Sequence, residues 1–357
     1  MNTFVSPLIS ITHKYRSLLL SCLFCILFLH TKAQDLSHYY DTNFVKTYPG
    51  LITGRIYLSQ KYTLLGIEAP KGTELLQFRP NTTINLGVGA TYKSVTLNLA
   101  YGFGFLNRDK DKGRTRYLDL QSRIYGVKWR YDIFGQFYSG YFLYPRGLAA
   151  ASPSTFYRRP DMKVRELGFN AYNIVNHKKY SYRAGFLQSE WQRKSAGSFL
   201  VGGGISYGWV EADSAFVPSS IKTQYKQNEV DGLRYAQFGP GAGYAYTLVI
   251  AKNWFIAGSL TGSIDLSITT ESVPNRTLTT VKVNPDFLFS AVAGYNSDLW
   301  SVNFSWVANR TAIEGYYREA GYHVSTGNYR FNLSRRLEPG PKLKKVMKGI
   351  DKLLDRK

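Results

Sequence analysis

Long runs of strict two-residue alternation constrain what this chain can fold into more than any other feature. From Thr82 the sequence reads TTINLGVGATYKSVTLNLAYGFGF, with an apolar side chain at every second position on both sides of a break at residues 93–94. Successive side chains of a β-strand point to opposite faces, whereas a helix repeats its apolar face every three or four residues. The runs therefore predict strands with one apolar face and one face of polar and small residues.

The same alternation returns along the rest of the chain and gives twelve such segments. They cover residues 84–92, 95–105, 117–124, 129–137, 166–171, 180–186, 199–209, 244–250, 254–266, 287–291, 300–306 and 328–333. Soluble strands usually have five or six residues, but several of these segments reach about ten or twelve, the length of a tilted strand that crosses a bilayer. We therefore expect an all-β fold, an antiparallel up-and-down transmembrane β-barrel of about twelve strands, or fourteen if weaker segments join the wall. A secreted soluble β-sandwich would also alternate and stays open as an alternative.

The strongest apolar run predicts export. Ser17–Leu29 reads SLLLSCLFCILFL and is too short to span about 30 Å of hydrocarbon as a helix. Lys14 and Arg16 precede it and small residues follow, which predicts a signal peptide over residues 1–33, cleaved between Ala33 and Gln34. Both cysteines of the chain lie inside this run, so the mature protein is expected to have no disulfide and no thiolate metal site.

Charge and hydropathy narrow the partners. The 357 residues carry a formal net charge of +21 and have a mean hydropathy of -0.24, which disfavours a bundle of membrane helices. Basic chains can bind nucleic acid, but an exported chain of alternating strands offers no basic recognition helix, so no nucleic-acid partner is expected. The expected partners of this positive charge are outer-membrane lipids, including the phosphates of lipopolysaccharide. The basic residues of the predicted outer loops are Arg108, Lys110, Lys112, Arg114, Arg146, Arg158 and Arg159.

Aromatic residues beside short turns predict which way the barrel points. The aromatics expected to form one girdle at a membrane boundary are Tyr92, Trp129, Tyr180, Trp254 and Trp300. In such barrels the short turns face the periplasm and the longer connections, here residues 107–114, 140–161, 269–282 and 311–320, face outward. One segment does not fit this scheme. If Glu190–Ser195 is an outer loop, the connection Glu211–Gln237 should be a short inner turn, yet it is long.

Charged residues also fall on the polar face of the predicted strands. The basic ones are Arg123, Lys128, Arg130, Arg183 and Arg330, and the acidic ones are Asp119, Asp132, Glu166 and Asp265. The near balance of the two signs argues against a strongly anion-selective pore. It favours an internal salt-bridge network that closes a narrow barrel.

The ends of the chain differ from the barrel segment. Residues 34–80 are expected to be an N-terminal leader with one or two weak strands, and residues 81–336 the barrel itself. After Pro339-Gly340-Pro341, the run KLKKVMKGIDKLLDRK places apolar residues at helical spacing among lysines. Residues 337–357 are therefore predicted to form a basic amphipathic helix on the periplasmic side, where it could meet an anionic leaflet.

Several motifs in order resemble one known family. They are TYPGLITGRIYLSQKYT from Thr47, RPNTTINLGVGATYKSVTLNLAYGFGF from Arg79, RTRYLDLQ from Arg114, DIFGQFYSGYFL from Asp132, QRKSAGSFLVGG from Gln192 and GPGAGYAYTLVIAKNWF from Gly239. Together they resemble a family of uncharacterised outer-membrane β-barrel proteins from the Bacteroidetes, a domain of unknown function. The resemblance covers nearly all of the mature chain and implies an outer-membrane location. It implies no catalytic or ligand-binding residue.

No catalytic constellation stands out from the residues. The mature chain has three histidines, His38, His177 and His323, and only the last could lie near an outer rim, with Glu319 or Glu314 as its partner. There is no metal-ligand spacing, and no enzyme activity and no cofactor are expected. The predicted function is an outer-membrane barrel of unknown substrate, either a narrow channel or a structural and envelope-binding protein, inserted by the barrel-assembly machinery. A barrel enzyme acting on lipid or polysaccharide is the alternative.

Overall fold

The computed structural model describes residues 39–70, 72–93, 95–103, 105–106, 109–317, 320–345 and 347. The signal peptide expected over residues 1–33 lies outside the described residues. Residues 35–338 form one compact unit, whereas residues 1–34 and 339–357 belong to another. In the part of the chain that the structure describes, no helix is long and apolar enough to cross a membrane.

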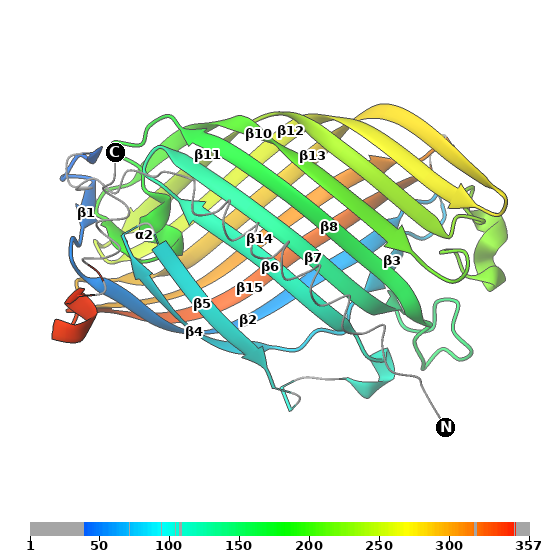
Figure 1. Ribbon diagram of the computed structural model, residues 1–357, viewed down its shortest axis with the longest axis horizontal. Helices are drawn as coiled ribbons and strands as arrows, with labels where there is room; N and C mark the ends of the chain where they lie inside the picture. The colour runs from blue at the N-terminus through cyan, green and yellow to red at the C-terminus, as the bar shows by residue number, and fades with distance from the viewer. Residues whose placement is uncertain are drawn as a thin grey trace, which may run out of the picture. The chain divides into compact units, whose positions relative to one another are not determined.

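Antiparallel strands make up most of the unit 35–338 (Figure 1). The strands are β1 Val45–Thr47, β2 Ile52–Ile67, β3 Leu76–Arg79, β4 Asn85–Tyr92, β5 Val95–Gly102, β6 Arg116–Tyr125, β7 Trp129–Tyr144, β8 Arg158–Ile174, β9 Glu190–Gln192, β10 Ala196–Glu211, β11 Gly232–Ile250, β12 Trp254–Val273, β13 Arg276–Asn296, β14 Trp300–Glu314 and β15 Gly321–Leu337. The short helices are η2 Lys110–Lys112, α2 Tyr182–Phe186 and η3 Ser219–Gln224.

Hydrogen bonding closes the sheet on itself. The ring of ten strands runs β2, β15, β14, β13, β12, β11, β10, β8, β7 and β3, and then returns to β2. Three more strands attach to this ring without completing it, because β4 pairs with β2, β5 with β4, and β6 with β7. The prediction of an antiparallel barrel is confirmed, but the closed ring has ten strands, not twelve. The reason is the short β3, which bridges β2 and β7 where β4, β5 and β6 do not reach.

The two faces of the wall are as different as the alternation predicts. Outward side chains such as Leu97 and Ile264 stay 65% and 68% exposed although they are large and apolar. Side chains on the inner face, such as those of Ser259 and Ser290, are buried. An apolar outer surface that continues around the ring has no soluble core to cover it, which is the arrangement of a barrel in lipid rather than of a sandwich.

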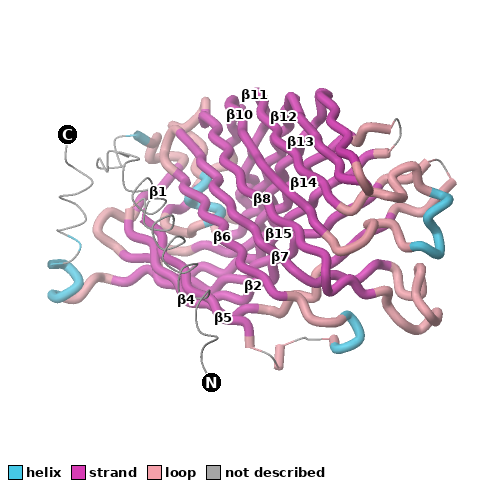
Figure 2. Tube along the Cα trace, turned by 45° about the vertical axis from the view of Figure 1, so that its right-hand side comes forward, coloured by secondary structure: helices cyan, strands magenta, loops and turns pink. Residues whose placement is uncertain are grey.

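One predicted strand is wrong, and the error explains the connection that did not fit. Residues 180–186 alternate Tyr180, Tyr182, Ala184 and Phe186, but the structure forms helix α2 there, inside a single excursion over residues 175–195 that links β8 to β10. Because residues 180–186 do not cross the wall, β10 starts at the same end of the barrel where β8 finishes. It therefore ends at the opposite end, and residues 212–231 lie there together with the other long loops (Figure 2). We call that end the loop end. The opposite end, which carries the connection between β4 and β5 and the turns at 126–128, 251–253 and 297–299, is the short-turn end.

Strand boundaries also differ from the expected ones. Residues 269–282 were expected to be a long connection, but β12 and β13 continue through them to a two-residue turn at Pro274-Asn275. Asn275 has a φ of 66°, a left-handed conformation that asparagine tolerates. At the other end of the chain the wall begins at Ile52 rather than residue 81, because β2 is a full wall strand that pairs with β15 over its whole length.

The predicted C-terminal helix is described only in part. Residues 341–345 and 347 are helical, and the Lys344 N–H donates to the Gly340 carbonyl at 2.9 Å. The remaining residues of the predicted helix, 346 and 348–357, lie outside the described residues. Its basic amphipathic face therefore stays a prediction.

Candidate functional site

A plug formed by residues 175–195 lies at the short-turn end of the barrel; we call it the short-turn plug. Ser181 begins helix α2 as its N-cap, and its hydroxyl oxygen accepts a hydrogen bond from the Ala184 N–H at 3.1 Å. The helix places Arg183 against Glu190, with 3.3 Å between guanidinium and carboxylate, and both side chains are almost fully buried. Strand β9 of the plug pairs with β1, so the N-terminal segment is tied to it as well.

Arginines from the wall hold the short-turn plug in place. Arg336 of β15 donates to the carbonyls of Gln188 at 2.6 Å and Glu190 at 3.2 Å, and Arg55 of β2 donates to the Leu187 carbonyl at 3.0 Å. Apolar packing adds to these bonds. The buried residues of this cluster are Tyr125, Tyr172, Ile174, Tyr180, Tyr182, Leu187, Ala196, Leu200 and Ala245. Because the acceptors are main-chain carbonyls, these two wall arginines hold the backbone of the plug in place without needing particular side chains in the plug.

A second plug, residues 212–231, lies at the loop end; we call it the loop plug. Phe216, Val217 and Val230 pack into a large apolar cluster with side chains of the surrounding strands. Arg159 donates to the carbonyls of Ser214 and Ala215 at 2.8 and 2.7 Å, so this buried side chain is a structural clamp and not the lipid-facing cation that the sequence predicted. Both ends of the barrel are thus occupied by its own chain.

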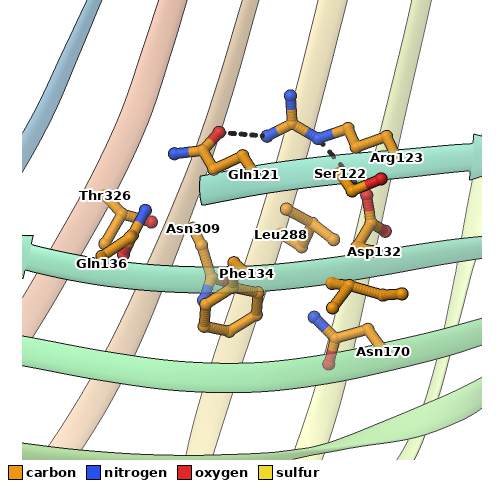
Figure 3. A pocket seen from close by; sticks show the side chains of 11 residues that line it. Gln121, Ser122, Arg123, Asp132, Phe134, Gln136, Asn170, Leu288, Asn309 and Thr326 are labelled. Atoms are coloured by element: carbon orange, nitrogen blue, oxygen red, sulfur yellow. Dashed lines mark hydrogen bonds and ion pairs between the residues drawn. The ribbon is translucent and has the colours of Figure 1, made fainter. Parts of the chain in front are cut away.

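The lumen between the two plugs is polar and holds small cavities. Three of them have volumes of about 70, 30 and 10 Å³. Adjacent cavities share lining residues, because Gln121 and Arg123 line the first two and Asn170 and Asn309 line the last two. Figure 3 shows the middle cavity, in which Arg123 lies between Gln121 and Asp132. The cavities form a row across the lumen, and each has room for water or a small polar group.

Comparison with protein-family models decides the family. Residues 39–334 match the model described as Domain of unknown function (DUF4421). The chain belongs to the DUF4421 family. This confirms the resemblance to a family of unknown function that the sequence motifs indicated, and no curated protein matches the chain.

Solved structures resemble the DUF4421 barrel only distantly. The outer membrane protease OmpT from Escherichia coli has a TM-score of 0.39 and 11% identity, with 81% of this chain and 97% of that chain covered. The toluene transporter TodX from P. putida has a TM-score of 0.25 and 9% identity over 81% and 90% of the two chains. Ail of Yersinia pestis has a TM-score of 0.20 and 8% identity over 81% and 100%. At these scores none of the three assigns a function to the DUF4421 chain.

The structure brings together part of the predicted lumen charge network. The Asp132 carboxylate forms ion pairs with Arg130 at 2.8 Å and with Arg123 at 3.3 Å, so these three residues form a triad on β6 and β7. Asp119 pairs with Lys61 of β2 at 3.0 Å, and it also accepts a hydrogen bond from the Tyr138 hydroxyl at 2.7 Å. Pairing within the lumen neutralises most of these charges.

The other half of the predicted network lies elsewhere. Arg183 belongs to the short-turn plug, and Lys128 lies in the turn between β6 and β7. Glu166 and Asp265 make no ion pair among the described residues, although Glu166 accepts a hydrogen bond from the Tyr235 hydroxyl at 2.9 Å. Arg330 contacts the ring of Tyr57, with its guanidinium carbon 4.4 Å from the ring centre, instead of a carboxylate. A single lumen-wide salt-bridge network is therefore wrong for the DUF4421 barrel.

Three of the five residues predicted to form a girdle lie on the outer face beside short turns. Trp129, Trp254 and Trp300 are the first residues of β7, β12 and β14, and each is exposed on the outer face at the short-turn end. Tyr92 ends β4 at the same end and is partly buried. Tyr180 is wrong, because it is buried in the short-turn plug, where it stacks edge-on against Tyr182. The error follows directly from taking the plug for a strand.

His323 does not form a catalytic site at the rim. It lies within β15, opposite Gly66 of β2, where its imidazole ring fills the space that the glycine leaves. The ring is buried, and its Nδ1 has no hydrogen-bond partner among the described residues. The expected partner Glu319 lies outside the described residues. Among the described residues there is also no group of His, Cys, Asp and Glu that could hold a metal ion.

Several side chains that line or border the lumen of the DUF4421 barrel were missed from sequence. Lys61 and Arg55 were overlooked because β2 was assigned to a leader, although Arg55, Tyr57, Ser59 and Lys61 alternate with Ile56, Leu58 and Gln60. Asp286, which lines the smallest of the three cavities, was missed on β13.

At the short-turn end, a hydrogen bond from the Lys46 ammonium holds the pKa of Asp298 below its ordinary value.

Proposed function

We propose that this protein is an outer-membrane β-barrel that forms a narrow channel, closed in its resting state by the two plugs. The apolar outer face of the ring supports a position in lipid, since it is exposed from one strand to the next. The tryptophans Trp129, Trp254 and Trp300 at the short-turn end support a girdle at the membrane boundary. In this orientation the short-turn plug faces the periplasm and the loop plug faces outward.

The observation that carries the proposal is the polar lumen. Buried polar atoms without a partner among the described residues line the inner face of many strands, and they include those of Ser259, Asn284, Ser290, Ser301 and Asn328. Leaving such an atom unsatisfied costs about 1–3 kcal/mol. A hydrated lumen satisfies them all through water, whereas a dry structural barrel would favour apolar side chains at these positions. The lumen is therefore built for water and polar solutes.

The plugs supply the gate. Each is held by side-chain donors aimed at main-chain carbonyls, which are contacts that can be released without breaking the strand ladders. Displacing the short-turn plug would connect the row of cavities to the periplasmic side. The passage that opens is narrow, because about ten strands enclose a lumen little wider than side chains can fill.

The test is fractionation followed by electrical recording. The native protein should fractionate with the outer membrane, and the purified barrel in a planar bilayer should show little steady current. A variant that frees the short-turn plug, Arg336→Ala, should show discrete channel openings. Recovery of the native protein as a folded, detergent-free periplasmic protein would contradict the membrane assignment. A freed plug without any current would contradict the channel.

A further inference from the structure

Backbone pairing is interrupted between β5 and β6. These strands follow each other in the chain, yet β5 pairs with β4 alone and β6 with β7 alone. At the loop end the ring is closed above this point by β3. The described residues of β5 and β6 therefore border a seam in the half of the wall nearer the short-turn end (Figure 1).

Side chains cross the seam where a strand ladder would be expected. Lys61 of β2 reaches Asp119 of β6 and donates to both its carbonyl and its carboxylate at 3.0 Å. The Tyr117 hydroxyl of β6 donates to Asn85 of β4 at 3.3 Å. Such side-chain contacts can be broken one by one, and the backbone of the hairpin β4–β5 pairs with the rest of the wall along β2 only. The hairpin can therefore move as a flap without unzipping the ring.

Exposure along β5 indicates that the lumen is reachable through the seam. Leu97 and Leu99 are exposed on the outer face, as elsewhere in the wall. Asn98 and Ala100, which point to the lumen side, are exposed as well. Inner-face residues of complete parts of the wall, such as Ser301 opposite Ser334, are buried.

The largest of the three cavities lies directly behind the seam. Thr96 and Asn98 line it from β5, and Gln121 and Arg123 line it from β6. Lys61 and Arg330 complete a basic wall, and none of the described residues that line this cavity is acidic. A small anionic group entering through the seam would therefore meet cations on more than one side.

Arg330 is the cation in this cavity that has no acid of its own. Lys61 pairs with Asp119 and Arg123 pairs with Asp132, but Arg330 makes no ion pair among the described residues. Its Nε is buried without a hydrogen-bond partner. A buried guanidinium without an anion is costly, and a carboxylate or phosphate is the group that satisfies it best.

We propose that the β5–β6 seam is a lateral portal through which an anionic amphiphile, one apolar chain with a carboxylate or phosphate head, enters the lumen from the membrane. The head lies against Arg330 and Arg123, and the apolar chain leaves through the seam between Leu97 and Leu99 of β5 and Leu118 of β6. This inference rests on the proposed membrane location and names the substrate class of the same lumen.

The physics of the bilayer favours this use of the seam. Unpaired backbone groups in hydrocarbon cost several kcal/mol each, so strand edges in lipid are normally paired. At the seam those groups can turn toward lumen water and a polar head instead. Because plugs occupy both ends of the barrel, the side is the direct route to the cavity in the closed state.

A photolabelling experiment tests the portal. The barrel is reconstituted in phospholipid bilayers with a long-chain fatty acid that carries a diazirine next to its carboxylate, illuminated, and mapped by peptide mass spectrometry. We expect labels on the lumen side of β6 and β15 in the native protein. The variant Arg330→Gln should lower this labelling about tenfold, the loss expected for one charge-assisted hydrogen bond. The corresponding long-chain alcohol and inorganic phosphate should not compete for the site.

A reversible lock provides the matched control. Cysteines at Asn98 and Gln121, which line the same cavity from the two sides of the seam, should be joined by a reducible bifunctional thiol reagent; this crosslink should abolish lumen labelling, and reduction should restore it. The pair Asn303→Cys/Asn332→Cys, whose native side chains are 2.8 Å apart on paired strands, should lock the wall elsewhere without effect. Labels on the outer face but not in the lumen of the native protein would overturn the portal and leave the membrane location intact. Absence of labels from both faces would overturn the membrane location as well, and competition by inorganic phosphate would overturn the amphiphile.

Discussion

Removing the Arg336 side chain should open the short-turn end of the barrel. Arg336 is 3% exposed, and its guanidinium donates to the carbonyls of Gln188 and Glu190 in the plug at 2.6 and 3.2 Å. Hydrogen bonds to a charged group contribute about 1.5–3 kcal/mol each. Arg336→Ala should therefore weaken docking of the plug by about 3–6 kcal/mol, which lowers the ratio of closed to open barrels by roughly a hundredfold to ten-thousandfold.

Single-channel recording of the reconstituted barrel measures this ratio directly. The native protein should be closed nearly all the time, and Arg336→Ala should show frequent openings. Arg335→Ala is the matched control, because the neighbouring arginine removes the same charge from the outer face, where it contacts the ring of Trp300. Hydrogen exchange of residues 180–190 should rise in the first variant only. Unchanged exchange and unchanged current in Arg336→Ala would show that the plug is not held by this residue.

Three other substitutions test separate parts of the structure. Phe304→Arg, on the outer face, should lower the free energy of unfolding in lipid by about 2–4 kcal/mol if it lies near the midplane, and Ser263→Arg, which points into the lumen opposite Asp286, should cost far less in the same titration. Gly66→Ala should cost about 1–3 kcal/mol, because its methyl group would meet the His323 ring at 2.0 Å, and the second substitution His323→Ala should restore stability; no restoration would contradict the packing. Arg159→Ala should make residues 212–231 sensitive to limited proteolysis, and continued resistance would contradict the clamp.

The wall was predictable from sequence because its signal is local. Each strand of a barrel shows its own alternation, so the outer face of β5 or β12 can be identified without knowing its neighbours. The closure was not predictable in the same way. It depends on β3, whose four residues are too few for a periodic signal, and on a register between β2 and β15 that joins opposite ends of the chain.

The plug was misread for a related reason. Residues 180–186 alternate as a strand does, but tertiary contacts with Arg55 and Arg336 favour a short helix inside the lumen. Ser181 was the available sign, since a serine before a short run can cap a helix. The lumen charges were identified by their position on the polar face. Their pairing was not, because Lys61 lies in a segment that was taken for a leader.

Accessibility of spin labels along β12 tests most directly that the ring of strands spans a membrane. Single cysteines would be placed at the outward residues Ile256, Leu260 and Ile264 and at the inward residues Ser259 and Ser263 and labelled with a nitroxide in the reconstituted barrel. We expect the outward labels to collide with oxygen and to be shielded from a water-soluble paramagnetic reagent, most strongly mid-strand, whereas the inward labels, enclosed between the two plugs, should be shielded from both. Outward labels as open to the aqueous reagent as to oxygen along the whole strand would contradict this expectation.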